Sequence, residues 1–177
     1  KGYMVLKNKG LEADDLAAWI VGKKEEFGIG DIWLISSDKD WDLLIKDGVS
    51  RFSTVTRKEI TIDNWEEHYD VEPDKYLTLK CLAGDTGDNI PGIAGIGPKR
   101  AVSLINDYGD LYDIYDSCPI DSKYKFIQSL NENADRLLLN AELMDLESYA
   151  EQAIIESGMN LEDLSSDIKG YLNGSNN

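Results

Sequence analysis

The pattern of apolar residues changes near residue 62, and this change restricts the fold more than any other feature of the sequence. Residues 31–36 form a short, almost continuously apolar run, which is typical of a strand buried in a parallel sheet. Residues 11–26 precede it with helical spacing, acids in the first turn and lysines later. Residues 49–54 and 58–62 predict two short strands joined by a polar turn. The first part of the chain is therefore predicted to form an α/β sheet.

The rest of the chain is predicted to be helical. Apolar residues recur at helical spacing over 63–70, 73–83, 98–108, 110–116, 122–132 and 133–144. Residues 173–177 carry no apolar side chain, and we expect them to be a disordered tail. The expected organisation is a partial parallel sheet flanked by helices over 1–62, followed by a helical region over 63–172.

Charge and cysteine content exclude several classes of protein. The chain has 34 acidic and 18 basic residues and a formal net charge of −16, so its overall field repels DNA. This objection loses force where carboxylates are ligands of divalent cations. Cys81 and Cys118 have no Cys-x-x-Cys spacing, which argues against a zinc site or a disulfide framework. No run of about 18 apolar residues and no secretory signal is seen, so we expect no membrane partner.

A first cluster of carboxylates stands at the start of the first helix. At about 100° per residue, Glu12 and Asp15 lie on one face of the helix, and Asp14 lies beside Asp15. Acids in a first turn also complement the helix dipole without any ligand. Both interpretations stay open for this cluster taken alone.

A second cluster follows the apolar strand directly. Ligands of parallel sheets bind beyond the carboxyl ends of the strands, and Asp38 and Asp40 are expected there. Either residue could instead cap the short helix that follows. Asp42, in the same stretch, is assigned to local structure.

A third cluster contains two aspartates three residues apart, Asp85 and Asp88, between glycines that allow sharp turns. An Asx-turn would explain them locally. Three separate groups of acids nevertheless favour hard divalent cations such as Mg²⁺ or Mn²⁺, which require oxygen ligands. Two such ions about 3.5–4 Å apart can activate a water and stabilise a phosphate undergoing hydrolysis.

The glycine-rich stretch 90–101 precedes a helical pattern. Gly95 and Gly97 predict a tight loop, Pro98 suits the first helical position, and Lys99 and Arg100 stand in the first turn. Backbone N–H groups at a helix N-terminus bind phosphate, and adjacent cations strengthen such a site. A simple turn between helices is the alternative. We expect this loop to grip a DNA phosphate, with Lys123 and Lys125 adding local positive charge.

The loop Gly-Ile-Gly-Pro-Lys-Arg-Ala resembles the helix-hairpin-helix element of the 5′ nuclease superfamily. The motifs before it are also similar to that family in order: Leu-Glu-Ala-Asp-Asp, then Ser-Ser-Asp-Lys-Asp-Trp-Asp, then Ala-Gly-Asp-Thr-Gly-Asp-Asn-Ile-Pro-Gly-Ile. The likeness is greatest to the 5′–3′ exonucleases of tailed bacteriophages and to the 5′ nuclease domain of bacterial DNA polymerase I. It covers at least residues 10–146.

The resemblance implies a PIN-like nuclease core and a role for each acidic group. Asp14, Asp15 and Asp38 would be catalytic and, with Glu12, would hold one of two Mg²⁺ or Mn²⁺ ions. Asp40, Asp85 and Asp88 would surround the second ion. Lys80 would be a catalytic cation near the scissile DNA. Gly95, Gly97, Lys99 and Arg100 would bind DNA, and the carbonyls of residues 92–97 would hold K⁺.

The resemblance also implies a function and shows one departure. The expected activity is hydrolysis of DNA as a flap endonuclease and 5′–3′ exonuclease in DNA replication. The expected substrates are DNA with 5′ flaps, branches or duplex ends and RNA–DNA primers. The expected location is the cytoplasm of a bacterial or phage-infected cell. The family's first strand and helical arch are not seen before residues 3–6, which look like a strand. Because Lys1 also replaces an initial methionine, we expect a fragment or processed chain whose companion segment completes the enzyme. The alternative is a non-catalytic DNA-binding module derived from such a nuclease.

Overall fold

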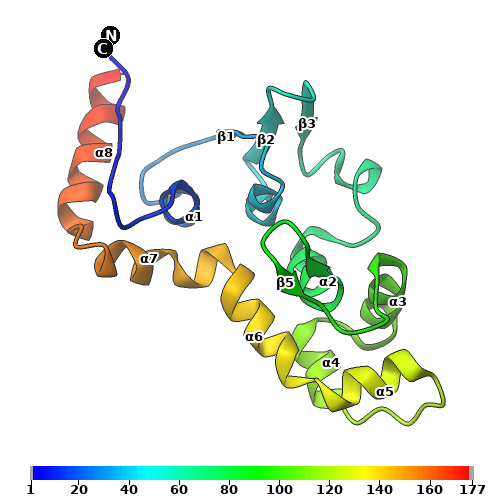
Figure 1. Cartoon of the computed structure of the whole chain (residues 1–177). Coiled ribbons are helices and arrows are strands. Elements are labelled where there is room, and N and C mark those ends of the chain that lie inside the picture. The colour runs from blue at the N-terminus through cyan, green and yellow to red at the C-terminus, as the bar shows by residue number, and fades with distance from the viewer. Residues whose placement is uncertain (1, 176–177) are drawn as a thin grey trace. The chain divides into compact units, whose positions relative to one another are not determined.

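The computed structural model describes residues 2–175, which Figure 1 shows as a coloured ribbon. The described residues form two compact units. One unit combines the chain up to Thr61 with the part from Leu146 onward. The other unit is Ile62–Asp145, so the chain leaves the first unit once and returns to it. The second unit begins beside the division expected at residue 62, but its end differs from the expected organisation.

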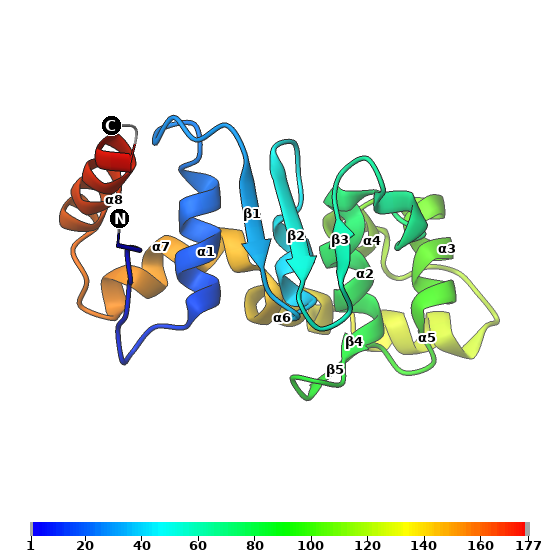
Figure 2. The ribbon, with the colours of Figure 1, turned by 90° about the horizontal axis from the view of Figure 1, so that it is seen from above.

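The first unit contains a three-stranded sheet in the order β1-β2-β3, visible side by side in Figure 2. β1 (Ile32–Ile35) and β2 (Val49–Ser53) are parallel, and β3 (Lys58–Ile60) pairs antiparallel with β2. The 3₁₀ helix η1 (Asp40–Leu44) lies in the connection between β1 and β2. This partly parallel sheet with surrounding helices confirms the predicted α/β class.

Three helices complete the first unit: α1 (Ala13–Gly22), α7 (Leu146–Glu156) and α8 (Leu161–Ser175). Their apolar faces meet in one core with the sheet. This core contains Leu16, Ala18, Trp19, Val21, Phe27, Leu34, Leu44, Val49, Ala150, Ile154, Leu164 and Ile168. Apolar burial is the main force that holds these separate segments together.

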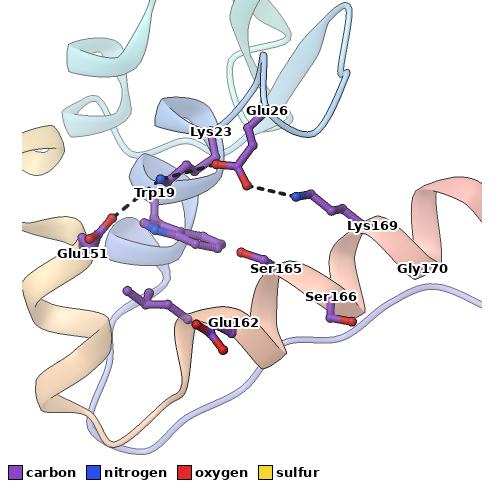
Figure 3. Close-up of a pocket in the computed structure, with 10 residues that line it drawn as sticks. Trp19, Lys23, Glu26, Glu151, Glu162, Ser165, Ser166, Lys169 and Gly170 are labelled. Atoms are coloured by element: carbon purple, nitrogen blue, oxygen red, sulfur yellow. Dashed lines mark hydrogen bonds and ion pairs between the residues drawn. The ribbon is translucent and has the colours of Figure 1, made fainter.

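Ion pairs at one edge of this unit join α8 to the segment after α1 (Figure 3). The Lys169 Nζ lies 3.0 Å from a Glu26 oxygen, and the Lys23 Nζ lies 3.5 Å from the other oxygen of Glu26. The hydrogen bond from Lys169 lowers the pKa of the Glu26 carboxyl. The C-terminal helices thus belong with the first 61 residues, whereas the sequence suggested one helical region over 63–172.

Both ends of the chain differ from expectation. α8 continues through Ser175, so residues 173–175 are helical, whereas residues 176–177 of the expected tail lie outside the described residues. Residues 3–6 form no strand. Their alternation has another cause: Met4 and Leu6 pack against the core of the first unit, while Tyr3 and Val5 are exposed. An alternating pattern without a pairing partner gives no sheet.

The second unit is helical apart from a two-stranded ribbon. Its helices are α2 (Tyr76–Ala83), α3 (Pro98–Tyr108), α4 (Leu111–Ser117), α5 (Lys125–Glu132) and α6 (Asp135–Met144), with the 3₁₀ helices η2 (Trp65–Glu67) and η3 (Pro73–Lys75) and the ribbon strands β4 (Gly84–Asp85) and β5 (Ile90–Pro91). The helix expected over 63–70 is absent, and a single 3₁₀ turn stands in its place. The buried Trp65 ring packs on Tyr69 and Tyr76, and its Nε1 donates to the Val71 carbonyl at 2.6 Å. These contacts hold the segment in a non-helical conformation.

Candidate functional site

The first two carboxylate clusters come together within the first unit. Asp14, on α1, accepts a 2.7 Å hydrogen bond at Oδ1 from the indole Nε1 of Trp41, on η1. Burial raises the pKa of the Asp14 carboxyl, the Trp41 hydrogen bond lowers it, and the charges of Asp38, Asp40 and Asp15 raise it further. Four carboxylates therefore interact at one end of α1, and their like charges oppose ionisation of Asp14.

The start of α1 also uses its acids locally. Glu12 and Asp15 form a reciprocal capping box, in which the Glu12 backbone N–H donates to Asp15 Oδ2 at 3.3 Å. This bond satisfies one of the N–H groups that a helix start leaves without a helical partner. The local interpretation is thus realised for Asp15, while Asp14 is directed to Trp41 instead.

The second cluster lies in a loop that a buried ion pair holds in place. Asp38 Oδ1 accepts a 3.0 Å hydrogen bond from the Asp40 backbone N–H, in a turn that starts directly after β1. Beneath this turn, Arg51 binds the 1% exposed Asp42 through Nε and Nη2 and donates from Nη1 to the Ser36 carbonyl. Asp42 is therefore a structural residue, as its assignment to local structure predicted.

The third cluster lies in the second unit, in the β4–β5 turn. Asp85 Oδ2 accepts a 2.8 Å hydrogen bond from Lys80 Nζ, and Asp85 Oδ1 accepts from the backbone N–H of Gly87 at 2.8 Å and of Asp88 at 3.3 Å. The Lys80 hydrogen bond is the main cause that lowers the pKa of the Asp85 carboxyl. The Asx-turn that was the local alternative for this cluster is present, and the Asp88 side chain is exposed.

The backbone around this turn is packed too closely for side chains. A Cβ on Gly84, whose φ is +79°, would lie 2.3 Å from the Gly92 nitrogen, and a Cβ on Gly92 would lie 2.3 Å from the Ala83 carbonyl carbon. Asn140, 1% exposed on α6, donates from Nδ2 to the carbonyls of Cys81 at 2.9 Å and Pro91 at 3.0 Å. The two glycines and Asn140 thus position the turn that carries Asp85.

The glycine loop has its conformational requirement at Gly95. Gly95 has a φ of +80°, and its carbonyl accepts a 2.5 Å hydrogen bond from Arg100 Nη1. Gly97, in contrast, has a φ of −97° and open space where a Cβ would lie. α3 then begins at Pro98, as expected, with exposed Lys99 and Arg100 in its first turn. The tight turn that the sequence assigned to both glycines needs only the first of them.

Several positioning residues were not identified from the sequence. Trp41 binds the predicted site residue Asp14, and Arg51 and Asn140 each support a turn that carries predicted site residues. The one available signal was Arg51, a lone basic residue inside a predicted strand. The third cluster and the glycine loop belong to the second unit, whereas the first two clusters belong to the first unit.

Two other features bear on the site. The groove of about 690 Å³ in Figure 3, in the first unit, is lined by none of the predicted site residues. Among the described residues, no helix has the length and hydrophobicity that a membrane crossing requires.

Solved structures similar to this chain come from phage T5. A crystal structure of a T5 protein co-crystallised with metal ions is 40% identical in sequence, with a TM-score of 0.84 over 92% of this chain and 60% of that chain. A T5 flap endonuclease variant crystallised as a pseudo-enzyme–product complex with DNA and metal ions is 42% identical, with a TM-score of 0.83 over 90% and 59% of the two chains.

Curated relatives and a family model agree with these structures. The flap endonuclease of Escherichia phage T5 is 43% identical over 88% of this chain and 53% of its own length. DNA polymerase I of Rhizobium leguminosarum is 34% identical over 80% of this chain and 14% of its own length. The chain thus spans about half of the phage relative. The model of the 5′-3′ exonuclease, C-terminal SAM fold, matches residues 71–167. This chain therefore belongs to the 5′–3′ exonuclease and flap endonuclease family.

Proposed function

We propose that this chain carries the metal-binding and DNA-docking part of a structure-specific 5′ nuclease that hydrolyses DNA phosphodiester bonds with two divalent metal ions. The observation that carries the proposal is the gathering of Asp14, Asp15, Asp38 and Asp40 at the start of α1, where burial and the three neighbouring charges raise the pKa of the Asp14 carboxyl. A protein without a cation at this place would gain stability by losing those charges. Metal ions in crystal structures of the T5 relative support the same conclusion.

The acidic residues divide between two ions in this proposal. Asp14, Asp15 and Asp38, with Glu12, hold the ion at the start of α1. We assign Asp40, the first residue of η1, and Asp85 and Asp88, in the β4–β5 turn, to the second ion. When bound, the cations lower the pKa of a water and offset the negative charge of the reacting phosphate.

Lys80 has a separate role. Its Nζ is held 2.8 Å from Asp85 Oδ2, and the side chain is only 10% exposed. An ammonium group fixed beside a metal-binding carboxylate can neutralise developing charge on a phosphate without moving. We therefore assign Lys80 to the scissile phosphate.

DNA docks on the glycine loop and the start of α3. The N–H groups at the N-terminus of α3 bind one phosphate, and Lys99 and Arg100 add positive charge. Gly97 allows the backbone to approach the phosphate, because no side chain covers it. Carbonyls of residues 92–97 hold K⁺, although the Gly95 carbonyl already accepts from Arg100.

The substrates in this proposal are DNA with 5′ flaps, branches or duplex ends and RNA–DNA primers. The place of action is the cytoplasm of a bacterial or phage-infected cell, because the relatives come from bacteria and phages. The second candidate is a non-catalytic DNA-binding module, in which the glycine loop and the start of α3 dock DNA without cleavage.

Calorimetry with Mn²⁺ tests the metal site. We expect binding to the wild-type chain and no binding to the Asp15→Asn/Asp38→Asn variant, with circular dichroism showing that the variant folds. Asp116→Asn/Asp167→Asn is the matched control, because it removes the same charge from two exposed positions. Unchanged Mn²⁺ binding to the first variant would exclude the two-metal site.

Cleavage of a labelled 5′ flap tests the reaction. Asp40→Asn or Asp85→Asn should reduce cleavage in Mg²⁺ while DNA affinity in Ca²⁺ is kept, measured with the chain alone and with the remaining segment of a family nuclease supplied in trans. Equal loss of cleavage and affinity would assign these residues to folding. DNA binding without cleavage in either condition would favour the non-catalytic module.

A further inference from the structure

A second groove, of about 370 Å³, lies within the second unit beside the glycine loop. It runs between the exposed face of α3 and the residues that lead into α5, and we call it the α3–α5 groove. Its floor is apolar, because Leu104 and Ile127 are both buried. A small concave site with an apolar floor and a few polar groups is typical of sites for small organic groups.

One wall of the α3–α5 groove is aromatic. The Tyr124 ring is 58% exposed and stacks on Phe126, with ring centroids 5.8 Å apart and an interplanar angle of 21°. The Arg100 guanidinium lies 4.6 Å from the centroid of the Phe126 ring, and Lys123 Nζ lies 6.0 Å from the Tyr124 centroid. Phe126 is thus held by Arg100, and Tyr124 presents an accessible aromatic surface between cations.

The opposite wall, formed by α3, has basic side chains at one end and an acidic side chain at the other. Lys99 and Arg100 stand in the first turn of α3, and Asp107 stands in its last turn. At 1.5 Å per residue, Asp107 lies about 12 Å along the helix from Lys99. Cations at one end suit a phosphate, and a carboxylate at the other end can accept a hydrogen bond from an amino group of a base.

The groove opens beside the proposed phosphate site. A Cβ on Gly95 would lie 3.3 Å from the Phe126 Cβ, so the glycine loop packs directly on the aromatic wall. Arg100 belongs to both places: it donates to the Gly95 carbonyl, and its guanidinium covers Phe126. A strand held by its phosphate at the start of α3 therefore has the groove within reach of its next nucleotide.

We propose that the α3–α5 groove binds an unpaired nucleotide of a DNA strand, with the base stacked on Tyr124 and the phosphate near Lys99 and Arg100. The proposal rests on the docking of DNA by the glycine loop and adds a site for a base that has left the duplex. A base inside a duplex is covered on both faces by its neighbours, so an aromatic side chain can stack on it only after it has left the stack. The groove thus distinguishes single-stranded DNA from a blunt duplex, which phosphate contacts alone do not do.

Fluorescence anisotropy in EDTA, with a labelled deoxycytidine hexanucleotide and a labelled blunt duplex, tests this groove. Tyr124→Ala should weaken binding of the hexanucleotide roughly 5- to 100-fold, the range expected for loss of one base–aromatic stack. Binding of the duplex should stay unchanged. Tyr124→Phe, which keeps the ring, should retain hexanucleotide binding. Tyr112→Ala is the matched control, because it removes a tyrosine of similar exposure from α4, which does not line the groove. It should leave hexanucleotide binding unchanged.

Each result decides the question. Two results would overturn the proposal that the groove binds an unpaired nucleotide: equal hexanucleotide affinity for Tyr124→Ala and Tyr112→Ala, or no hexanucleotide binding by the wild-type chain. Equal losses for hexanucleotide and duplex would also overturn it. If the wild-type chain binds the hexanucleotide through Tyr124 but not the duplex, the groove is supported and the docking of duplex DNA on the glycine loop fails.

Discussion

Arg51 binds Asp42 through two parallel hydrogen bonds, from Nε to Oδ1 at 2.5 Å and from Nη2 to Oδ2 at 2.9 Å. Both side chains are buried, at 5% and 1% exposure. The third nitrogen of the guanidinium donates to the Ser36 carbonyl at 3.0 Å, at the end of the strand that precedes Asp38. A buried charge pair in the core of the first unit therefore fixes the loop that carries Asp38 and Asp40.

Arg51→Met should be strongly destabilising, because it leaves the Asp42 carboxylate buried without its cation. Loss of one partner of a buried ion pair costs about 3–5 kcal/mol. The double variant Arg51→Met/Asp42→Leu should recover most of that loss, since it leaves no buried charge. Urea unfolding of the wild type, Arg51→Met, Asp42→Leu and the double variant measures the coupling between the two residues. A double variant as unstable as Arg51→Met alone would contradict this account.

Asn140→Ala should destabilise the second unit and disturb the β4–β5 turn. The substitution removes this donor from the buried Cys81 carbonyl and from the partly buried Pro91 carbonyl, and an unsatisfied buried group costs roughly 1–3 kcal/mol. Thermal unfolding measures the loss, with Asn133→Ala as the control, because Asn133 makes an exposed amide hydrogen bond to Ser129. Equal melting temperatures for the two variants would show that Asn140 does not hold the turn.

Local features of the fold could be predicted from the sequence, and contacts between distant segments could not. The spacing of Leu16 and Trp19 predicted α1, and Pro98 predicted the start of α3. Asn140 lies 59 residues from Cys81, and no local pattern predicts such a hydrogen bond. Similarly, the apolar faces of α7 and α8 show that these helices need a partner but not that α1 provides it.

The candidate site divides in the same way. The acidic residues were visible because their spacing and the family motifs are local in sequence. Their environment was not visible: among the three acids at the start of α1, Asp14 accepts a hydrogen bond from Trp41, and Asp85 accepts one from Lys80. Rotation about each side chain and packing of neighbouring elements decide such pairings, so they follow from the fold only.

The raised pKa of Asp14 predicts how stability without metal depends on pH. Its folded-state pKa exceeds the unfolded value, so folding takes up a proton, and stability falls as pH rises from the unfolded to the folded value. Asp14→Asn removes this loss and keeps an acceptor for Trp41. In EDTA, the melting temperature of Asp14→Asn relative to wild type should therefore rise with pH across this window.

Divalent metal should make the wild-type chain more stable than Asp14→Asn. Added Mn²⁺ binds the folded wild-type chain and should stabilise it by about 2.7 kcal/mol at 100 times the dissociation constant, whereas Asp14→Asn should gain less. Asp167→Asn, an exposed position on α8, is the control for the loss of one charge. If the difference in melting temperature between Asp14→Asn and the wild type depends on neither pH nor Mn²⁺, Asp14 is not a ligand of the metal.

The glycine loop offers a prediction in which two similar substitutions have different effects. Gly95→Ala should destabilise the second unit, because Gly95 has a φ of +80° and an added Cβ would lie 3.3 Å from the Phe126 Cβ. Gly97→Ala should leave stability unchanged, since its φ is −97° and the space for a Cβ is open, but should weaken DNA binding by covering the backbone that approaches the phosphate. Thermal unfolding and anisotropy with a labelled duplex separate the two effects.

The cations of the same loop should act on affinity and not on sequence preference. Lys99→Ala/Arg100→Ala should weaken binding of every duplex alike, because phosphate contacts carry no base information. The slope of log affinity against log salt should flatten by roughly 1–2, if each side chain neutralises one phosphate. Because Arg100 also donates to the Gly95 carbonyl, Lys99→Ala alone isolates the charge effect from the support of the loop. A salt slope that stays at the wild-type value in Lys99→Ala/Arg100→Ala would move the DNA site away from the start of α3.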